Sequence, residues 1–308
     1  MKIKLITIFL SISCLIAGQF GGYSIFGYDN QSEGFDVSRV YVQYTDNLAD
    51  DLFMKIRYDL DRLDRPTDGK LYGYLKNAYV DWTCKTGGLF TIGLLGTNSY
   101  GVQEQTWGYR YVAKSAPDYW KLTNTADFGV GYSHSFGDIN FNAQILNGEG
   151  YKEYGNKKNT ELATYIRVFY GESKLNKNDG YNVGLVMTST PGGELDKDKT
   201  LMGVFGGWSK DNLRFGVEHN SHEYGETITI NSVYMNYSMG NWNFFARNDM
   251  MEEDSDHDHK GHDHDSEHSV THVGASWNPT NGLYISPNVI IDDAKDEDTV
   301  RLTFMFKY

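Results

Sequence analysis

The sequence has little of several features that would place it in a common class of protein. It holds only two cysteines, and Cys14 lies in the first apolar segment, so the mature chain keeps Cys84 alone and forms no internal disulfide bond. The mean hydropathy of −0.53 is too polar for a protein that crosses a membrane with helices. No four-strand blade motif recurs along the chain, which argues against a propeller or a solenoid.

Long apolar runs are also missing, apart from residues 5–17. This run follows Lys2 and Lys4 and ends in small residues, which is typical of a secretory signal peptide. A lipoprotein signal cleaved before Cys14 is the alternative, but the residues before Cys14 fit that pattern poorly. We therefore expect a signal peptide over residues 1–18 and a single mature domain over residues 19–308.

Aromatic residues make up 15% of the chain, and they recur at regular positions. Runs of alternating residues close on an aromatic just before a polar turn, at Tyr44, Trp82, Phe136, Tyr170, Trp208, Tyr237, Trp277 and Tyr308. Most of these closing residues are about 30–40 positions apart, which leaves room for two strands and two turns. Tyrosine and tryptophan gather where the apolar part of a membrane meets water, so the recurrence predicts an outer-membrane β-barrel.

The last segment shows the alternation most plainly. Its apolar residues from Val300 to Tyr308 alternate with a mixed set from Thr299 to Lys307, and a strand places the two sets on opposite faces. The same template predicts a transmembrane antiparallel β-barrel of about 16 strands, each near the length that spans a membrane. The expected strands are 20–28, 35–45, 52–61, 72–83, 88–96, 126–136, 139–147, 161–170, 180–189, 200–208, 212–221, 226–239, 241–250, 269–277, 282–291 and 299–308.

Strand parity predicts which charged side chains face the inside of this barrel. A Lys or Arg that faces lipid at mid-membrane costs ~2–4 kcal/mol, so the lumen is the favoured side. Arginine is the most frequent charged residue at wall positions, and rings of Arg and Lys favour anions. A weakly anion-selective pore is therefore predicted, with a mixed-charge lumen of little selectivity as the alternative. The predicted pore-lining residues are Arg39, Lys55, Arg57, Asp81, Arg167, Arg214, Arg247 and Arg301.

Several short segments resemble the phosphate-selective porin O and P family and its broader porin relatives. They are residues 35–39, 75–82, 90–93, 146–151 and 246–249, and the resemblance extends from Tyr23 to Tyr308. It implies an outer-membrane channel, commonly a homotrimer, through which small solutes or anions diffuse. Phosphate specificity is not carried over, because the chain has no dense lysine cluster that would form an anion funnel.

The longest connection, residues 97–125, follows the fifth predicted strand and is therefore the third outer loop. Long loops in compact domains are usually functional. In sixteen-stranded porins the third loop folds inward and narrows the channel, so we expect a constriction loop here that carries Glu104, Arg110 and Lys114. The alternative is an outer lid that is exposed to solvent.

A histidine-rich segment, residues 252–268, lies between the thirteenth and fourteenth strands. Imidazole binds Zn, Cu and Ni well, and short His-rich tracts are a compositional sign of metal binding. The candidate ligands are His257, His259, His262, His264 and His268. Their spacing is not that of a structural zinc site, and an acidic loop that is merely solvated is the alternative. No other cofactor is predicted.

The preferred function is a passive porin in the outer membrane of a Gram-negative-type bacterium, in contact with lipid and with small solutes or anions and not with nucleic acid. The first alternative is a surface metal-binding protein that the barrel anchors. The second is an outer-membrane enzyme, which needs a nucleophile and a base held together. No recognisable motif frames His219, His222 or the serines in this way, so no catalytic residue is predicted.

Overall fold

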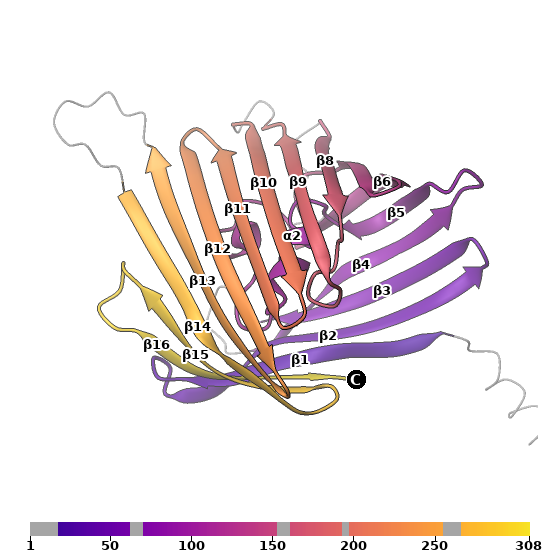
Figure 1. The fold of residues 1–308 in the computed structure, drawn as a ribbon. Coiled ribbons are helices and arrows are strands. Elements are labelled where there is room, and N and C mark those ends of the chain that lie inside the picture. Colours follow the sequence, from indigo (N-terminus) through magenta and orange to yellow (C-terminus); the bar gives the residue numbers. More distant parts are fainter. Residues whose placement is uncertain (1–17, 62–69, 153–160, 193–196, 255–265) are drawn as a thin grey trace, which may run out of the picture.

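The chain folds into one closed antiparallel β-barrel (Figure 1). The computed structural model describes residues 18–61, 70–152, 161–192, 197–254 and 266–308. Within them every strand pairs with its neighbours in the sequence, and β1 pairs with β16 to close the ring. The strands are β1 (Gln19–Asp29), β2 (Gly34–Ala49), β3 (Leu52–Asp61), β4 (Tyr72–Thr83), β5 (Leu89–Gly96), β6 (Ala126–Phe136), β7 (Ile139–Leu146), β8 (Ala163–Gly171), β9 (Gly180–Thr190), β10 (Lys199–Lys210), β11 (Leu213–Glu223), β12 (Thr227–Met239), β13 (Trp242–Asp254), β14 (Ser266–Thr280), β15 (Leu283–Asp292) and β16 (Thr299–Lys307). The predicted antiparallel β-barrel of about 16 strands is confirmed.

Alternation along each strand decides which side chains face outward. On β12, Val233, Met235 and Tyr237 are exposed on the outer surface, whereas the intervening Tyr234 and Asn236 are buried inside the barrel. This period of two is the property from which the sheet was predicted. The predicted bounds 52–61, 72–83 and 126–136 coincide with β3, β4 and β6.

Aromatic rings gather at one end of the barrel, where the even-numbered strands finish. Trp242 stacks on Trp277 with ring centroids 5.9 Å apart, and Trp82 stacks on Phe90 at 5.7 Å. Phe136 and Tyr170 are exposed at the same ends of their strands. The regular aromatic positions in the sequence therefore form one belt, because every second strand ends at the same rim.

The turns at this aromatic rim are tight. Gly137 and Gly240 each begin a two-residue turn with φ of 60°, a conformation that glycine adopts without strain. Both turns fall between predicted strands, at the pairs Gly137-Asp138 and Gly240-Asn241 of the sequence. Among the described helices, none is both long and apolar enough to cross a membrane.

The first and the last strand, β1 and β16, meet where the ring closes. The amide of Gly22 donates to the carbonyl oxygen of Tyr308 at 2.9 Å, and the amide of Tyr308 donates back to Gly22 at 3.2 Å. The hydroxyl of Tyr308 donates to the carbonyl oxygen of Tyr41 at 2.9 Å. The terminal aromatic residue thus joins β16 to both β1 and β2. Of the predicted signal peptide, only Gly18 falls within the described residues.

Candidate functional site in the barrel interior

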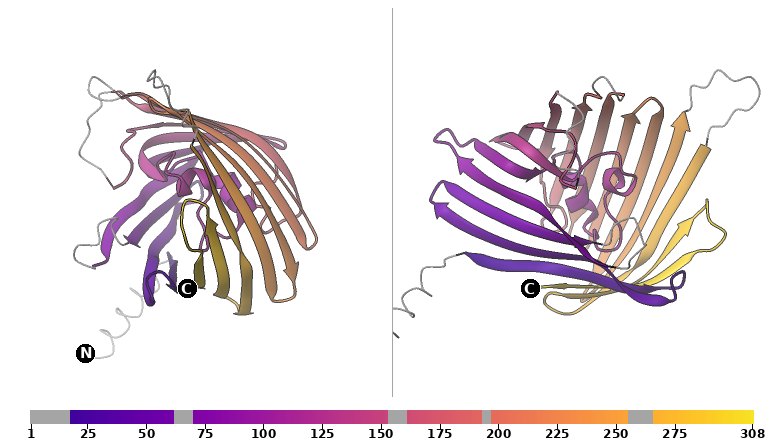
Figure 2. Two further views of the ribbon diagram at one scale, coloured as in Figure 1. Left: turned by 90° about the vertical axis from the view of Figure 1, so that its left-hand side faces the viewer. Right: turned by 180° about the vertical axis from the view of Figure 1, so that it is seen from behind.

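The long connection between β5 and β6 carries two short helices, α2 (Gly101–Trp107) and α3 (Ala116–Tyr119). Figure 2 shows this segment within the ring of strands. Trp107 is fully buried, and its ring lies 5.6 Å from that of Tyr234 on β12 and 5.8 Å from that of Phe245 on β13. Both partners face inward on their strands. The connection therefore packs against the inner wall through an apolar surface of its own.

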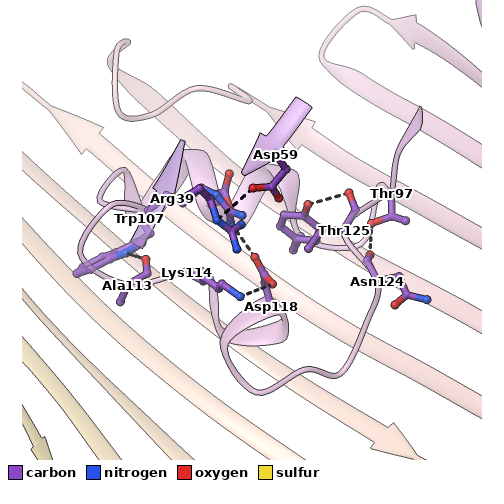
Figure 3. A network of polar contacts seen from close by, with 12 residues as sticks. Arg39, Asp59, Thr97, Trp107, Ala113, Lys114, Asp118, Asn124 and Thr125 are labelled. Carbon is purple, nitrogen blue, oxygen red and sulfur yellow. Dashed lines mark hydrogen bonds and ion pairs between the residues drawn. The ribbon is translucent and has the colours of Figure 1, made fainter. Parts of the chain in front are cut away.

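Two local features set the path of this connection. Gly108 ends α2 with a φ of 80°, and a side chain at this position would meet the guanidinium of Arg214 at 2.7 Å. The indole Nε1 of Trp107 then donates to the carbonyl oxygen of Ala113 at 2.9 Å, which closes the turn (Figure 3). Glycine is needed here both for the left-handed backbone and for the close approach of the wall.

Four arginines of the wall hold the backbone of the connection. Each donates a hydrogen bond to one of its carbonyl oxygens: Arg167 on β8 to Asn98 at 3.1 Å, Arg214 on β11 to Trp107 at 3.1 Å, Arg301 on β16 to Val112 at 2.8 Å, and Arg247 on β13 to Lys114. Arg167, Arg214, Arg247 and Arg301 were all predicted to line the pore. The structure places them on the inner face, where their guanidinium groups anchor the connection.

The charged residues of the connection pair mainly with one another. Arg110 contacts the carboxylates of Glu104 and of Asp118, the latter at 2.8 Å. Lys114 lies 3.4 Å from Asp118 (Figure 3). Burial alone would raise the pKa of Asp118, but the charges of Arg110 and Lys114 outweigh it and lower that pKa below its usual value. The three predicted loop residues, Glu104, Arg110 and Lys114, thus belong to one network of ion pairs with Asp118.

A cluster of cations occupies the inner wall on β2, β3 and β4. Three cationic groups surround the ring of Tyr41, with Arg39 at 5.6 Å, Arg57 at 5.1 Å and Lys76 at 5.6 Å from its centroid. The one carboxylate that pairs with this cluster in the described ion pairs is Asp59, 3.6 Å from Arg39 and 3.7 Å from Lys76. We call Arg39, Arg57 and Lys76 the basic wall cluster.

Lys76 was not among the predicted pore-lining residues, because simple parity places it on the lipid side with Ala78 and Val80. The pairing of β3 with β4 shifts register between Arg57 and Tyr58, and this irregularity turns the side chain of Lys76 inward. There its amine donates to Thr125 Oγ1 at 2.9 Å. A bulge is a property of two paired strands, so the sequence of one strand does not reveal it.

The remaining predicted wall residues lie on the same part of the barrel. Lys55 faces Tyr79 in the pairing of β3 with β4, and Asp81 accepts a hydrogen bond from Thr91 Oγ1 at 2.6 Å. Arg57 donates to the side-chain oxygen of Gln43 through two nitrogens, at 2.6 and 3.0 Å. These polar contacts join neighbouring strands and give β2 to β5 a hydrophilic inner surface.

A polar cavity of about 330 Å³ lies between the long connection and this part of the wall. Its lining includes four cations and two acids, which are Arg39, Lys114, Lys121, Lys152, Asp118 and Glu149. Threonine, asparagine and tyrosine side chains complete it. The connection contacts the wall from β8 to β16, and beside β2 it borders a space whose lining carries more cations than acids.

The candidate histidines are separated by the wall. His219 lies on the outer face, where its Nδ1 is 2.8 Å from the side-chain oxygen of Asn231, and His222 is buried on the inner face of the same strand. Side chains on opposite faces of one strand cannot act in a common catalytic site. His257, His259, His262 and His264 lie outside the described residues, whereas His268 is described at the start of β14.

Solved structures of porins share this fold. An outer-membrane protein of Vibrio cholerae, OmpT with loop L8 deleted, superposes with a TM-score of 0.66 at 11% identity, over 95% of this chain and 99% of that one. OmpF of Salmonella typhi, in a complex with daunomycin, gives 0.68 at 11% identity, over 94% and 97%. A triple mutant of the Rhodopseudomonas blastica porin gives 0.59 at 17% identity, over 94% and 100%. No family model matches the sequence, and no curated protein matches it either.

Proposed function

We propose that this protein is an outer-membrane porin, a water-filled channel through which small hydrophilic solutes and ions diffuse passively with a weak preference for anions. The outer face supports the location. Valine, methionine and aromatic side chains are exposed along the strands, as in Val204, Phe215 and Met235, and a belt of aromatics marks one rim. Such a surface is stable in lipid and costly in water.

The observation that carries the proposed selectivity is the basic wall cluster beside the polar cavity. The four cations of that cavity exceed its two acids, and the basic wall cluster adjoins it through Arg39. In a confined space with low-dielectric walls, fixed positive charge raises the local concentration of anions. The anchored connection borders this space directly, because Lys114, Asp118 and Lys121 of the connection belong to its lining.

The proposal can be tested in planar lipid bilayers. We expect stepwise open conductance, and a reversal potential in a salt gradient whose sign corresponds to an excess of anion current. Arg39→Gln and Lys121→Gln each remove one charge from the cavity, so both should shift the reversal potential toward cation selectivity. Lys177→Gln removes a charge from the connection after β8 and serves as the control.

A barrel that inserts but conducts no current would refute the channel. A reversal potential of the opposite sign, or one that Arg39→Gln leaves unchanged, would refute the anion preference while leaving the channel intact. Membership of the phosphate-selective porin O and P family, export by residues 1–18 and assembly into a trimer stay predictions from the sequence. Crosslinking in native membranes would test the trimer.

A further inference from the structure

Three potential metal ligands meet at the rim opposite the aromatic belt, where β14 starts and β15 ends. The imidazole Nε2 of His268 lies 2.6 Å from Asp292 Oδ1 and 3.8 Å from Asp293 Oδ1. One ligand atom from each of the three residues lies within 4.8 Å of the other two. Val270 on β14 pairs with Asp292 on β15, and His268 lies two positions before Val270. The register of the two strands therefore brings the side chain of His268 close to Asp292 and Asp293.

These separations suit a small divalent cation. Ligand atoms at the ~2.0–2.2 Å bond lengths of zinc are about 3.3 Å apart in a tetrahedral site. The distances from Nε2 to the two carboxylate oxygens, 2.6 and 3.8 Å, bracket this value, so small side-chain rotations suffice to bring both oxygens to it. One imidazole nitrogen and two carboxylate oxygens are a donor set that Zn²⁺ accepts, and water can complete the coordination.

The backbone and the long connection fix two of the three ligands. The amide of Ser269 donates to both oxygens of Asp293 at 2.9 Å, which positions that carboxylate beside β14. Trp120 of the connection lies edge-on to the imidazole of His268, with ring centroids 5.0 Å apart and planes at 89°. The indole Nε1 of Trp120 in turn donates to Asp249 at 3.2 Å. A ligand set that is held before the metal arrives binds it at lower entropic cost.

Access and charge also favour a cation at this position. Asp292 is 8% exposed, but His268 is 24% and Asp293 is 54% exposed, so the cluster is open to solvent on one side. The amine of Lys295 now occupies the cation position next to Asp292, 2.8 Å from its Oδ2. Lys295 is 56% exposed, and its flexible side chain can swing away into water when a divalent ion replaces it.

From this arrangement we propose that His268, Asp292 and Asp293 form a binding site for a divalent transition metal, Zn²⁺ in the first place, at the outer rim of the barrel. The site is built from described strand ends and does not depend on the proposed channel activity. The sequence indicated only His268. The two aspartates open the acidic run of residues 292–298 in the sequence, and only the strand pairing brings them to the histidine.

The test is a calorimetric titration of the full-length detergent-solubilised protein with Zn²⁺. The other histidines of the His-rich segment would obscure the signal, so the reference protein carries His257→Asn, His259→Asn, His262→Asn and His264→Asn. In this background we expect one Zn²⁺ per chain. His268→Ala and Asp293→Asn should each weaken the affinity by about tenfold or more, because each removes one ligand.

Two further variants separate a metal site from a general attraction of acids for cations. Asp296→Asn removes one charge from the same loop outside the cluster and should leave the affinity unchanged. Lys295→Gln removes the competing amine and should raise it several-fold. Cu²⁺ bound to the reference protein should show the spectroscopic signature of one imidazole nitrogen in electron paramagnetic resonance, and this signature should vanish in His268→Ala.

Absence of stoichiometric Zn²⁺ binding in the reference protein would overturn the proposal. Equal losses in Asp293→Asn and Asp296→Asn would also overturn it, since they would show diffuse electrostatic binding. A heat-modifiable band in electrophoresis, the usual sign of a folded barrel, confirms that each variant is folded before its affinity is compared.

Discussion

Arg247 on the barrel wall donates a hydrogen bond to the carbonyl oxygen of Lys114 in the long connection, although the two residues are 133 positions apart. The same guanidinium pairs with Asp249, and both side chains are fully buried. One arginine thus neutralises a buried carboxylate and fixes the connection to β13. The wall and the segment inside the lumen are therefore a single packed unit, and their stabilities are coupled.

Replacement of this arginine should destabilise the barrel strongly. Arg247→Met leaves Asp249 buried without its ion-pair partner, which costs about 3–5 kcal/mol of unfolding free energy. The double variant Arg247→Met/Asp249→Leu removes both charges and should recover part of that loss. Urea unfolding of the protein in lipid vesicles measures both values, with Lys177→Gln as a control of unchanged stability. A single variant as stable as the parent would contradict the coupling.

A second contact between the long connection and the wall is a hydrogen bond between two uncharged side chains. The hydroxyl of Tyr111 donates to Ser276 Oγ at 2.5 Å, and both residues are buried. Tyr111→Phe and Ser276→Ala should each lower the unfolding free energy by about 0.5–1.5 kcal/mol. Because the two changes remove the same bond, the double variant should lose less than the sum of the two single losses. Additive losses in this cycle would show that the two side chains act independently.

The carboxylate of Asp118 in the long connection predicts that the stability of the protein depends on pH. The pKa of Asp118 is lowered in the folded protein, so its charged form stabilises the fold at pH values above the ordinary carboxyl pKa of about 3.9, and this contribution is lost as the pH falls through the lowered value. Asp118→Asn should therefore be less stable than the parent at pH 7. The difference should shrink as the pH falls below about 4. Unfolding titrations of both proteins from pH 7 to pH 3 measure it, and a difference that stays constant would contradict the role of Asp118.

Closure of the ring should depend on the last residue. Deletion of Tyr308 removes two main-chain hydrogen bonds with Gly22 and the hydroxyl contact with Tyr41, and we expect a lower yield of folded barrel in lipid vesicles. Tyr308→Phe keeps the main-chain pair and should cost only about 1 kcal/mol. The folded fraction is read from heat-modifiable electrophoresis. Equal yields for the deletion and the parent would show that closure does not need this residue.

The strands were predictable because their signal is local. In β16, Thr303 and Met305 are buried inside while Val300 and Phe306 are exposed outside, as the alternation of the sequence requires. The turns at Gly137 and Gly240 were predictable for the same reason. In a membrane strand, apolar and polar side chains alternate within about ten residues, so the pattern can be recognised in a short segment without knowledge of the rest of the fold.

The roles of the arginines were not predictable. Parity placed Arg39 and Arg301 on the inner face alike, but Arg39 lines the polar cavity and Arg301 holds the carbonyl oxygen of Val112. The difference arises from where the long connection lies, and the connection has no strand periodicity to place it. Lys76 was missed because its direction depends on an irregular pairing with β3.

The sequence by itself determined that this chain forms a β-sheet with one apolar and one polar face. Successive side chains of a strand point to opposite faces, so alternating apolar and polar residues separate onto the two faces. The tertiary structure alone decided which polar groups meet. Asp59 and Tyr151 come together across the interior of the barrel, and His268 meets Asp292 only through the register in which β14 pairs with β15. Alternation fixes the face of a residue but carries no information about its partner across the sheet or across the lumen.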